Sequence, residues 1–294
     1  MDLEMNTLLP AFDFRREGEK PPVGFSKASG HLVFDVKMDF TRKSRWVKDG
    51  HLTPDAIDSN FAGVVSRESV RIALTYAALN SLDICAADVK SAYLQAPTSE
   101  KHYVICGPEF PLEYQGHIGV IKRALYWGKF AGSDYWKHMP TCMDHLGFKP
   151  CYADPEFWMQ KAINPEDNTE YWEYVLLYVD DALCISHRPR EVLEKEIGKY
   201  WIMKEKSIGT PNIYLGNKVS NVTLENGVSA WSFSSFQYVQ SAVHNVEKHL
   251  RSINQSLPKY VPALFTTNYQ PEIDISSTLN EFDSSYYQSL ISIL

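Results

Sequence analysis

Two apolar runs rich in β-forming residues, separated by little more than an aspartate pair, constrain the fold of this chain most. The first run covers residues 171–178 (YWEYVLLY) and the second covers residues 182–186 (ALCIS). Runs of this length and composition favour strands, and so short a connection favours an antiparallel hairpin. The pattern predicts a hairpin that carries Asp180 and Asp181 at its tip. A plain turn is the alternative, because Asp is common in turns.

A third carboxylate follows another apolar run. Residues 82–87 (LDICAA) read as a buried strand that leads into Asp88, with Tyr93 five residues further on. An aspartate that caps a helix is the alternative at this position. Three carboxylates gathered at strand ends would raise each other's pKa unless a cation neutralised them. Hard oxygen ligands suit Mg²⁺, and a pair of such ions supports nucleotidyl transfer.

The rest of the chain reads as an α+β fold with an antiparallel sheet at its centre. Further strands are expected at 33–38, 157–159, 213–215 and 231–233, and helices at 66–78, 133–146, 189–200, 237–250 and 286–294. Ser66 is a candidate cap of the first of these helices. Pro140 predicts a kink or a break within the second. Residues 1–30 read as a loosely structured lead-in.

Composition sets limits on partners and compartment. The 294 residues carry 29 Lys and Arg against 36 Asp and Glu, a net charge of −7, which argues against binding nucleic acid through bulk charge. A local basic stretch at 37–48, which contains Lys43 and Arg45, could supply that contact. Five scattered cysteines and a start without a signal-peptide pattern predict an intracellular protein, cytoplasmic or nuclear. No apolar run is long enough to span a membrane.

The order of the motifs resembles the reverse transcriptase of copia-type LTR retrotransposons. The resemblance covers roughly residues 31–294 and rests on segments that follow in family order: TRKSRWV (41–47), ADVKSAYL (87–94), RALY (123–126), YVDD (178–181), IYLG (213–216) and YYQSLI (286–291). It implies an RNA-directed DNA polymerase with a right-hand fold. Fingers and palm would occupy residues 31–230, and a partial thumb with the start of a connection residues 231–294. RNase H would be missing, as in a fragment of a longer polyprotein.

The resemblance also implies a metal site and partners. Asp88 and Asp180 would bind two Mg²⁺ ions, with Mn²⁺ as a substitute. Asp181 would complete the acidic triad, and the main-chain carbonyl of Val89 would add a ligand. An RNA template, a DNA primer and dNTPs would be the substrates, and no membrane is involved. The remaining polyprotein domains, integrase and RNase H, would be partners in the parent element.

Further residues would contact the substrates by the same resemblance. Lys43 and Arg45 would hold the triphosphate, and Tyr93 would stack under the deoxyribose and exclude a 2′-hydroxyl. Tyr126 and Lys129 would lie near the incoming nucleotide or the template. Lys204 is a candidate for the acid that protonates pyrophosphate, or a surface lysine.

Departures from the family pattern leave alternatives open. Trp127 stands where the family usually has glycine, although Gly128 follows it, and Pro140 falls inside a helix. A catalytically inactive retroelement remnant that retains only nucleic-acid binding is therefore a second interpretation. An unrelated α+β protein with an acidic cation site is a third. His138, Cys142 and His145 offer zinc-type ligands at helical spacing, but the spacing matches no zinc-finger pattern.

Overall fold

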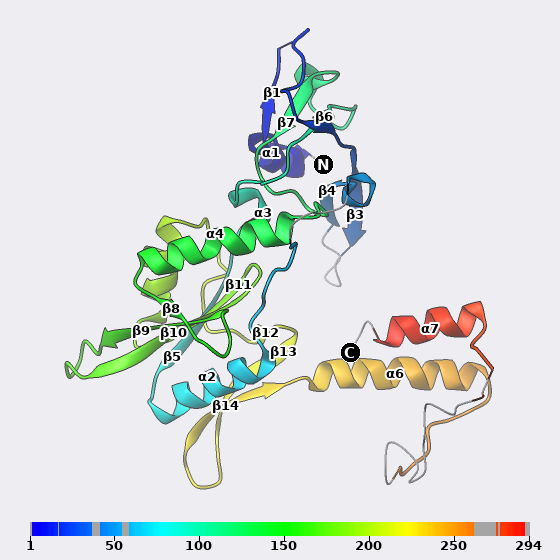
Figure 1. Cartoon of the computed structure of the whole chain (residues 1–294). Helices are drawn as coiled ribbons and strands as arrows, with labels where there is room; N and C mark the ends of the chain where they lie inside the picture. Colours follow the sequence, from blue (N-terminus) through cyan, green and yellow to red (C-terminus); the bar gives the residue numbers. More distant parts are fainter. Residues whose placement is uncertain are drawn as a thin grey trace. The chain divides into compact units, whose positions relative to one another are not determined.

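The computed structural model describes residues 2–16, 18–36, 42–54, 59–261, 275 and 277–291. The chain divides into two compact units, Met1–Thr210 and Pro211–Leu294 (Figure 1). The predicted boundary between palm and thumb, at residues 230 and 231, falls inside the second unit, where residues on both sides of it belong to one sheet. The assignment of fingers, palm and thumb stays a prediction.

A five-stranded sheet forms the centre of the first unit. Its order is β5-β11-β10-β9-β8, and every neighbouring pair is antiparallel. The strands are β5 (Asp83–Asp88), β8 (Lys149–Pro150), β9 (Phe157–Ile163), β10 (Glu170–Tyr178) and β11 (Asp181–Ser186). The predicted α+β fold with a central antiparallel sheet is confirmed, and so is the hairpin formed by β10 and β11.

Two helices cover the two faces of this sheet, α4 (Ala131–His145) on one and α2 (Arg67–Leu79) on the other (Figure 1). The buried core under α4 joins the helix to strand residues such as Val175 and Cys184. On the other face, Tyr76 packs its ring against Tyr174 at 4.8 Å. Ser66 caps α2 by accepting a hydrogen bond from the amide of Ser69, as predicted.

Of the expected kink or break at Pro140, the break is wrong, because α4 continues through this residue to His145. A proline inside a helix removes one backbone hydrogen bond. Met139, Cys142 and Met143 are all buried on the side of α4 that faces the sheet. Apolar packing on both sides of Pro140 therefore holds the helix together.

The expected loose lead-in at 1–30 is also wrong for its first half. Helix α1 (Asp2–Leu8) leads into β1 (Phe12–Phe14), which pairs with β7 (Ile118–Ile121). Met5, Leu8 and Phe12 are buried in a second core. Burial of these side chains orders the segment, which also contributes to a four-stranded sheet with β2 (Ser26–Lys27) and β6 (His102–Ile105).

A separate two-stranded hairpin carries the basic stretch. Strands β3 (Gly30–Val36) and β4 (Arg42–Lys48) pair antiparallel, and Trp46 and Val47 are buried. The predicted strand at 33–38 is confirmed to residue 36, and Lys37 and Met38 lie outside the described residues. The short helix α3 (Ala92–Gln95) follows β5, and α5 (Pro189–Glu191) opens a helical segment that runs to Lys199.

The second unit contains a three-stranded sheet and two helices. The strands are β12 (Ile213–Tyr214), β13 (Asn217–Thr223) and β14 (Ser229–Ser234). The helices are α6 (Phe236–Ser252) and α7 (Glu281–Ile291), joined by a stack of the His249 and Tyr286 rings at 4.0 Å. Within the described part of the chain, every helix is too short or too polar to cross a bilayer.

Candidate active site

Asp88 and Asp181 face each other across neighbouring strands. They are direct register partners at the ends of β5 and β11, so their side chains lie on the same face of the sheet. Asp180 is the second of the two residues that connect β10 to β11, and Asp181 is the first residue of β11. The structure thus brings the three predicted carboxylates to one end of the central sheet. The tip is a turn, as the alternative expected, and this turn lies beside Asp88.

The backbone at the hairpin tip is held in an unusual conformation. Val179, the first residue of the connection, has a φ of 54°, a value that a β-branched residue rarely adopts. The amide of Val89 donates a hydrogen bond to the carbonyl of Asp180 at 2.7 Å. This bond connects the hairpin tip to the residue after β5. Strained backbone positions like that of Val179 are common at functional sites.

The carboxylates at this end of the sheet disfavour each other's charge. Burial raises the pKa of Asp181 to about 6, and the charges of Asp180 and Asp88 contribute to the increase. Burial and the charge of Asp88 also raise the pKa of Asp180, against the opposing effect of Lys204 and Lys43. The site therefore favours an added positive charge.

Lys204 supplies one such charge. Its ammonium lies 2.6 Å from a carboxylate oxygen of Asp88, and its amide donates to the Asp88 carbonyl at 2.7 Å. The amide of Asp88 in turn donates to the Ser207 hydroxyl at 3.0 Å. Lys204 was predicted to be either a proton donor or a surface lysine. No pattern in the sequence predicted these contacts between the 204–207 turn and Asp88.

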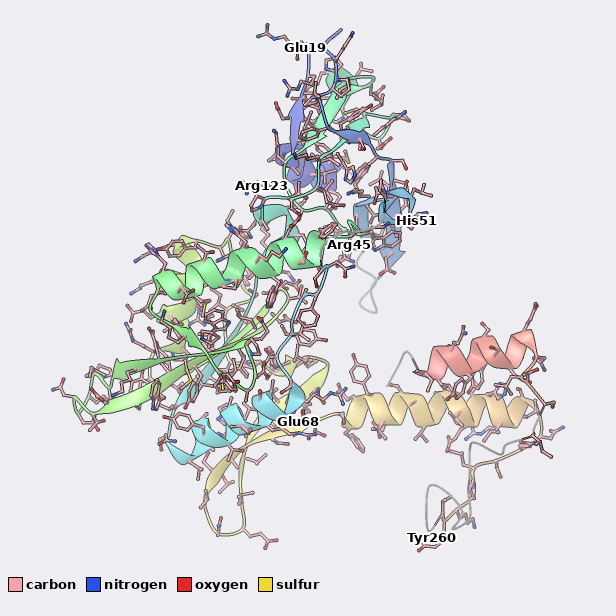
Figure 2. All side chains as sticks on the ribbon, in the orientation of Figure 1. Glu19, Arg45, His51, Glu68, Arg123 and Tyr260 are labelled. Carbon is pink, nitrogen blue, oxygen red and sulfur yellow. The ribbon has the colours of Figure 1, made fainter. Side chains whose placement is uncertain are left out.

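A cavity of about 450 Å³ opens beside Asp180. Arg45, Tyr93 and Tyr126, three of the predicted substrate-binding residues, line it together with Trp127 and Val179. The guanidinium of Arg45 lies 5.2 Å from the centre of the Tyr126 ring, a cation–π distance. Figure 2 labels Arg45 near the first turn of α4, whose residues Ala131 and Gly132 form another wall.

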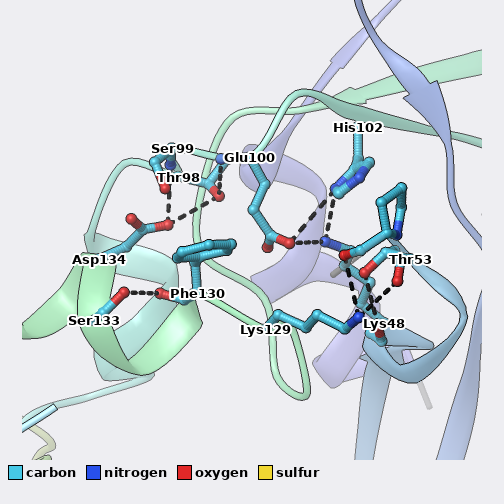
Figure 3. A network of polar contacts seen from close by, with 12 residues as sticks. Lys48, Thr53, Thr98, Ser99, Glu100, His102, Lys129, Phe130, Ser133 and Asp134 are labelled. Atoms are coloured by element: carbon cyan, nitrogen blue, oxygen red, sulfur yellow. Dashed lines mark hydrogen bonds and ion pairs between the residues drawn. The ribbon is translucent and has the colours of Figure 1, made fainter. Parts of the chain in front are cut away.

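Lys43 and Lys129 occupy different positions from these three residues. Lys43 pairs with Asp35 in the β3–β4 register and lowers the pKa of Asp180 through its charge. The ammonium of Lys129 donates to the carbonyls of Thr53 and Pro54 at 2.6 and 3.1 Å (Figure 3). It thereby fastens the loop after β4 to the segment before α4, a role without a signature in the sequence.

A buried ionic network joins the basic hairpin to β6 nearby (Figure 3). The Lys48 ammonium lies 2.7 Å from Glu100 and 2.8 Å from Nδ1 of His102. The side chains of Lys48 and Glu100 are only 1% and 8% exposed. Because a buried charge is costly without a partner, this pair fixes the position of β4, and hence of Arg45.

In the part of the chain that is described, no three His, Cys, Asp or Glu side chains converge as a ready metal site. At the aspartates, the Lys204 ammonium takes an oxygen of Asp88 instead. The proposed zinc ligands have other surroundings: Cys142 is buried in the core, and the His138 ring packs on Trp201 at 5.2 Å.

Comparison with known proteins identifies the family that this chain resembles. The family described as reverse transcriptase (RNA-dependent DNA polymerase) matches residues 22–262. The chain is 27% identical over 197 residues to the retrovirus-related Pol polyprotein from transposon TNT 1-94 of Nicotiana tabacum, across 64% of this chain and 14% of that polyprotein.

Two more relatives are of the same kind. The retrovirus-related Pol polyprotein from transposon RE1 of Arabidopsis thaliana is 26% identical over 151 residues, across 50% of this chain and 10% of that protein. The transposon Ty1-LR2 Gag-Pol polyprotein of Saccharomyces cerevisiae is 26% identical over 163 residues, 53% of this chain and 8% of that protein.

The chain thus spans 14% or less of the length of these three polyproteins. The family match covers far more than half of the chain, and it includes the β10–β11 hairpin, Asp88 and the cavity between them and β4. The third interpretation, an unrelated α+β protein, is therefore wrong. The chain belongs to the reverse transcriptase (RNA-dependent DNA polymerase) family, and it is of the copia type that its motif order predicted.

Proposed function

We propose that this chain catalyses RNA-directed DNA synthesis, with attack of a primer 3′-hydroxyl on the α-phosphate of a dNTP. The observation that carries the proposal is the register pairing of Asp88 with Asp181 beside Asp180, at the edge of the 450 Å³ cavity. A right-hand arrangement of fingers, palm and thumb is part of the proposal. The central sheet would be the palm, and the β3–β4 hairpin would belong to the fingers.

The donor set at the sheet end fits divalent cations. Asp88, Asp180 and Asp181 offer hard carboxylate oxygens, the ligand type that Mg²⁺ and Mn²⁺ prefer, and the Val89 carbonyl would add another. Two such cations, when bound, lower the pKa of the attacking hydroxyl and stabilise the leaving pyrophosphate. The raised pKa values of Asp180 and Asp181 support this assignment, because the paired carboxylates favour positive charge.

The cavity walls suit a deoxynucleoside triphosphate. Arg45 would bind its phosphates, since a guanidinium makes paired hydrogen bonds with phosphate oxygens, and Lys43 would add a second positive charge. Tyr93, on α3 between Tyr126 and Tyr135, would lie under the deoxyribose and leave no room for a 2′-hydroxyl. Tyr126 would line the sugar and base side, whereas Lys129 would act indirectly by holding the 50–54 loop.

One observation favours the second function, nucleic-acid binding without synthesis. The Lys204 ammonium lies on the Asp88 carboxylate, in the position where a cation would have to bind. A chain in which this ion pair is permanent would still present Arg45 and Lys43 to phosphates. It would bind template and primer without joining nucleotides.

Primer extension on an RNA template tests the proposal. The 294-residue chain with Mg²⁺ or Mn²⁺ should extend a DNA primer, and Asp180→Asn should abolish extension. Asp83→Asn is the matched control, because Asp83 lies at the opposite end of β5 and is exposed. Extension that persists in Asp180→Asn contradicts the catalytic assignment. Salt-sensitive binding of the template–primer duplex by a wild-type chain that extends no primer favours the second function instead.

A further inference from the structure

We propose that Trp127 is a stacking platform for the base of the incoming nucleotide. The inference rests on the proposed function, because it assigns a role within the same cavity. Its starting point is a large aromatic side chain that lines the cavity, is 61% exposed, and occupies a backbone position suited to glycine.

The backbone around Trp127 forms a tight turn. The amide of Gly128 donates to the carbonyl of Leu125 at 3.0 Å, and Trp127, the third residue of the turn, has a φ of 64°. A positive φ at the third position is the mark of a type II turn, where glycine is strongly favoured. A tryptophan there is strained, because its Cβ crowds the backbone.

The surrounding structure forces this conformation on the turn. The amide of Lys48 donates to the carbonyl of Tyr126 at 2.9 Å. The carbonyl of Trp127 lies so close to Gly50 that any Cβ on residue 50 would overlap it. Lys129 holds the same loop through Thr53. Glycine at position 127 would satisfy all these contacts without strain, so the fold itself has no need for the indole.

Burial does not explain the indole either. Most of its surface is exposed to solvent, and its ring packs edge-on against the His31 ring, with the ring centres 5.9 Å apart and the planes at 71°. His31 is itself held by Asp49 at 2.8 Å, and Asp49 accepts a hydrogen bond from Ser29 at 2.6 Å. This chain of contacts orients the indole at the cavity without covering it.

The chemistry of the cavity identifies the ligand group that the indole suits. Arg45 offers a phosphate-binding guanidinium, and Asp180 lies at the same cavity. A nucleotide that places its phosphates at these two residues needs a flat surface for its base, and exposed aromatic rings stack on every base type. Trp127 therefore improves the binding of all four dNTPs through the base and leaves the triphosphate contacts unchanged.

Equilibrium binding to the 294-residue chain with Mg²⁺ and no template tests the inference, because base pairing cannot contribute. The probes are dATP and 1′,2′-dideoxyribose 5′-triphosphate, which carries the same phosphates without a base. Wild type should bind dATP about 10-fold more tightly than the abasic compound, the size expected for one stacking contact. Trp127→Ala and Trp127→Gly should both lose this preference, and Trp127→Phe should keep most of it.

The alanine and glycine variants separate stacking from a structural role. Both lack the indole, but only alanine keeps a strained positive φ, so Trp127→Ala should unfold at a lower temperature than Trp127→Gly. If residue 127 only shapes the loop, dATP affinity will follow stability and Trp127→Gly will bind dATP as wild type does. That result overturns the inference, as does tighter binding by Trp127→Gly, which would make the indole an obstruction.

The abasic probe distinguishes failure of this inference from failure of the proposed function. If wild type binds both triphosphates equally, the base makes no stacking contact and the inference fails alone. If wild type binds neither, the cavity is not a nucleotide site and both proposals fail. Trp172→Phe is a control for a partly exposed tryptophan outside the cavity and should leave the preference for dATP unchanged.

Discussion

The carboxylates of Asp88 and Asp181 belong to directly opposed residues on β5 and β11, with no residue of offset between them. Like charges in this arrangement destabilise a sheet. Burial raises the pKa of Asp181 to about 6, and repulsion from the charges of Asp180 and Asp88 contributes to this increase. The same opposition is useful if cations bind, so stability and function make conflicting demands on these residues.

Replacing Asp181 with asparagine should therefore stabilise the metal-free protein. The folded state holds the Asp181 proton more tightly than the unfolded state, so the penalty grows as pH rises from about 4 to about 6 and is complete above that range. Two pKa units correspond to about 3 kcal/mol, which partial exposure reduces to about 1 kcal/mol. Urea unfolding in EDTA should show Asp181→Asn more stable than wild type at pH 8 and equal near pH 4. Asp83→Asn, on the same strand, should show no such gain.

Lys204 competes with any cation for Asp88, so Lys204→Met should tighten binding of Mn²⁺. One unit charge a few ångströms away is worth about 1 kcal/mol in a solvent-like dielectric, or about fivefold in affinity. Titration of Mn²⁺ followed by electron paramagnetic resonance measures the change. Lys206→Met, which removes the same charge two residues away, is the control. Weaker Mn²⁺ binding in Lys204→Met would show that the lysine assists the site instead.

Local sequence patterns were sufficient to predict part of this site. The hairpin followed from two β-rich runs around an acidic pair, and the strand before Asp88 from its apolar residues. The opposition of Asp88 to Asp181 could not be derived in this way, because a register between residues 93 positions apart leaves no local signal. Only the order of the motifs, through the family resemblance, indicated that these residues meet.

Contacts to backbone groups were beyond prediction for a related reason. Lys129 was expected near the incoming nucleotide or the template, which stays a prediction. The contacts of its ammonium with two main-chain carbonyls were not expected, because every residue has such a carbonyl. The ordered segment at 2–14 was missed because the polar, proline-containing stretch that follows it indicated a loose lead-in. Met5 and Phe12 are fixed by a core that the distant residues 104–125 complete.

The buried pair of Lys48 and Glu100 should prove far more sensitive to single than to double substitution. Lys48→Met leaves the Glu100 carboxylate in a site that is 8% exposed, and loss of one partner of a buried pair costs about 3–5 kcal/mol. Lys48→Met combined with Glu100→Gln removes both charges and should recover much of that loss. A double-mutant cycle of urea unfolding measures the coupling. Additive losses would mean that the pair is accessible to solvent.

Glu156 and Asp154, two residues apart, should give pH dependences of opposite sign. Burial raises the pKa of Glu156 to about 7 from an ordinary 4.5, although it accepts a hydrogen bond from the Trp136 indole. Burial would also raise the pKa of Asp154, but hydrogen bonds from Ser69 and Ser66 outweigh it and lower that pKa.

The contribution of Glu156 to the free energy of unfolding should consequently fall as pH rises from about 4.5 to 7, because the folded state retains the Glu156 proton and the unfolded state releases it. Glu156→Gln keeps an acceptor for Trp136, removes the titration, and should gain about 2–3 kcal/mol relative to wild type by pH 8. Asp154→Asn should instead lose stability at neutral pH and match wild type only at low pH, below the depressed pKa of Asp154. Free energies of unfolding measured across this range check both. If Glu156→Gln keeps the wild-type slope between pH 4.5 and 7, the Glu156 carboxyl is ionised at neutral pH in the folded protein, and the hydrogen bond from Trp136 must then outweigh its burial.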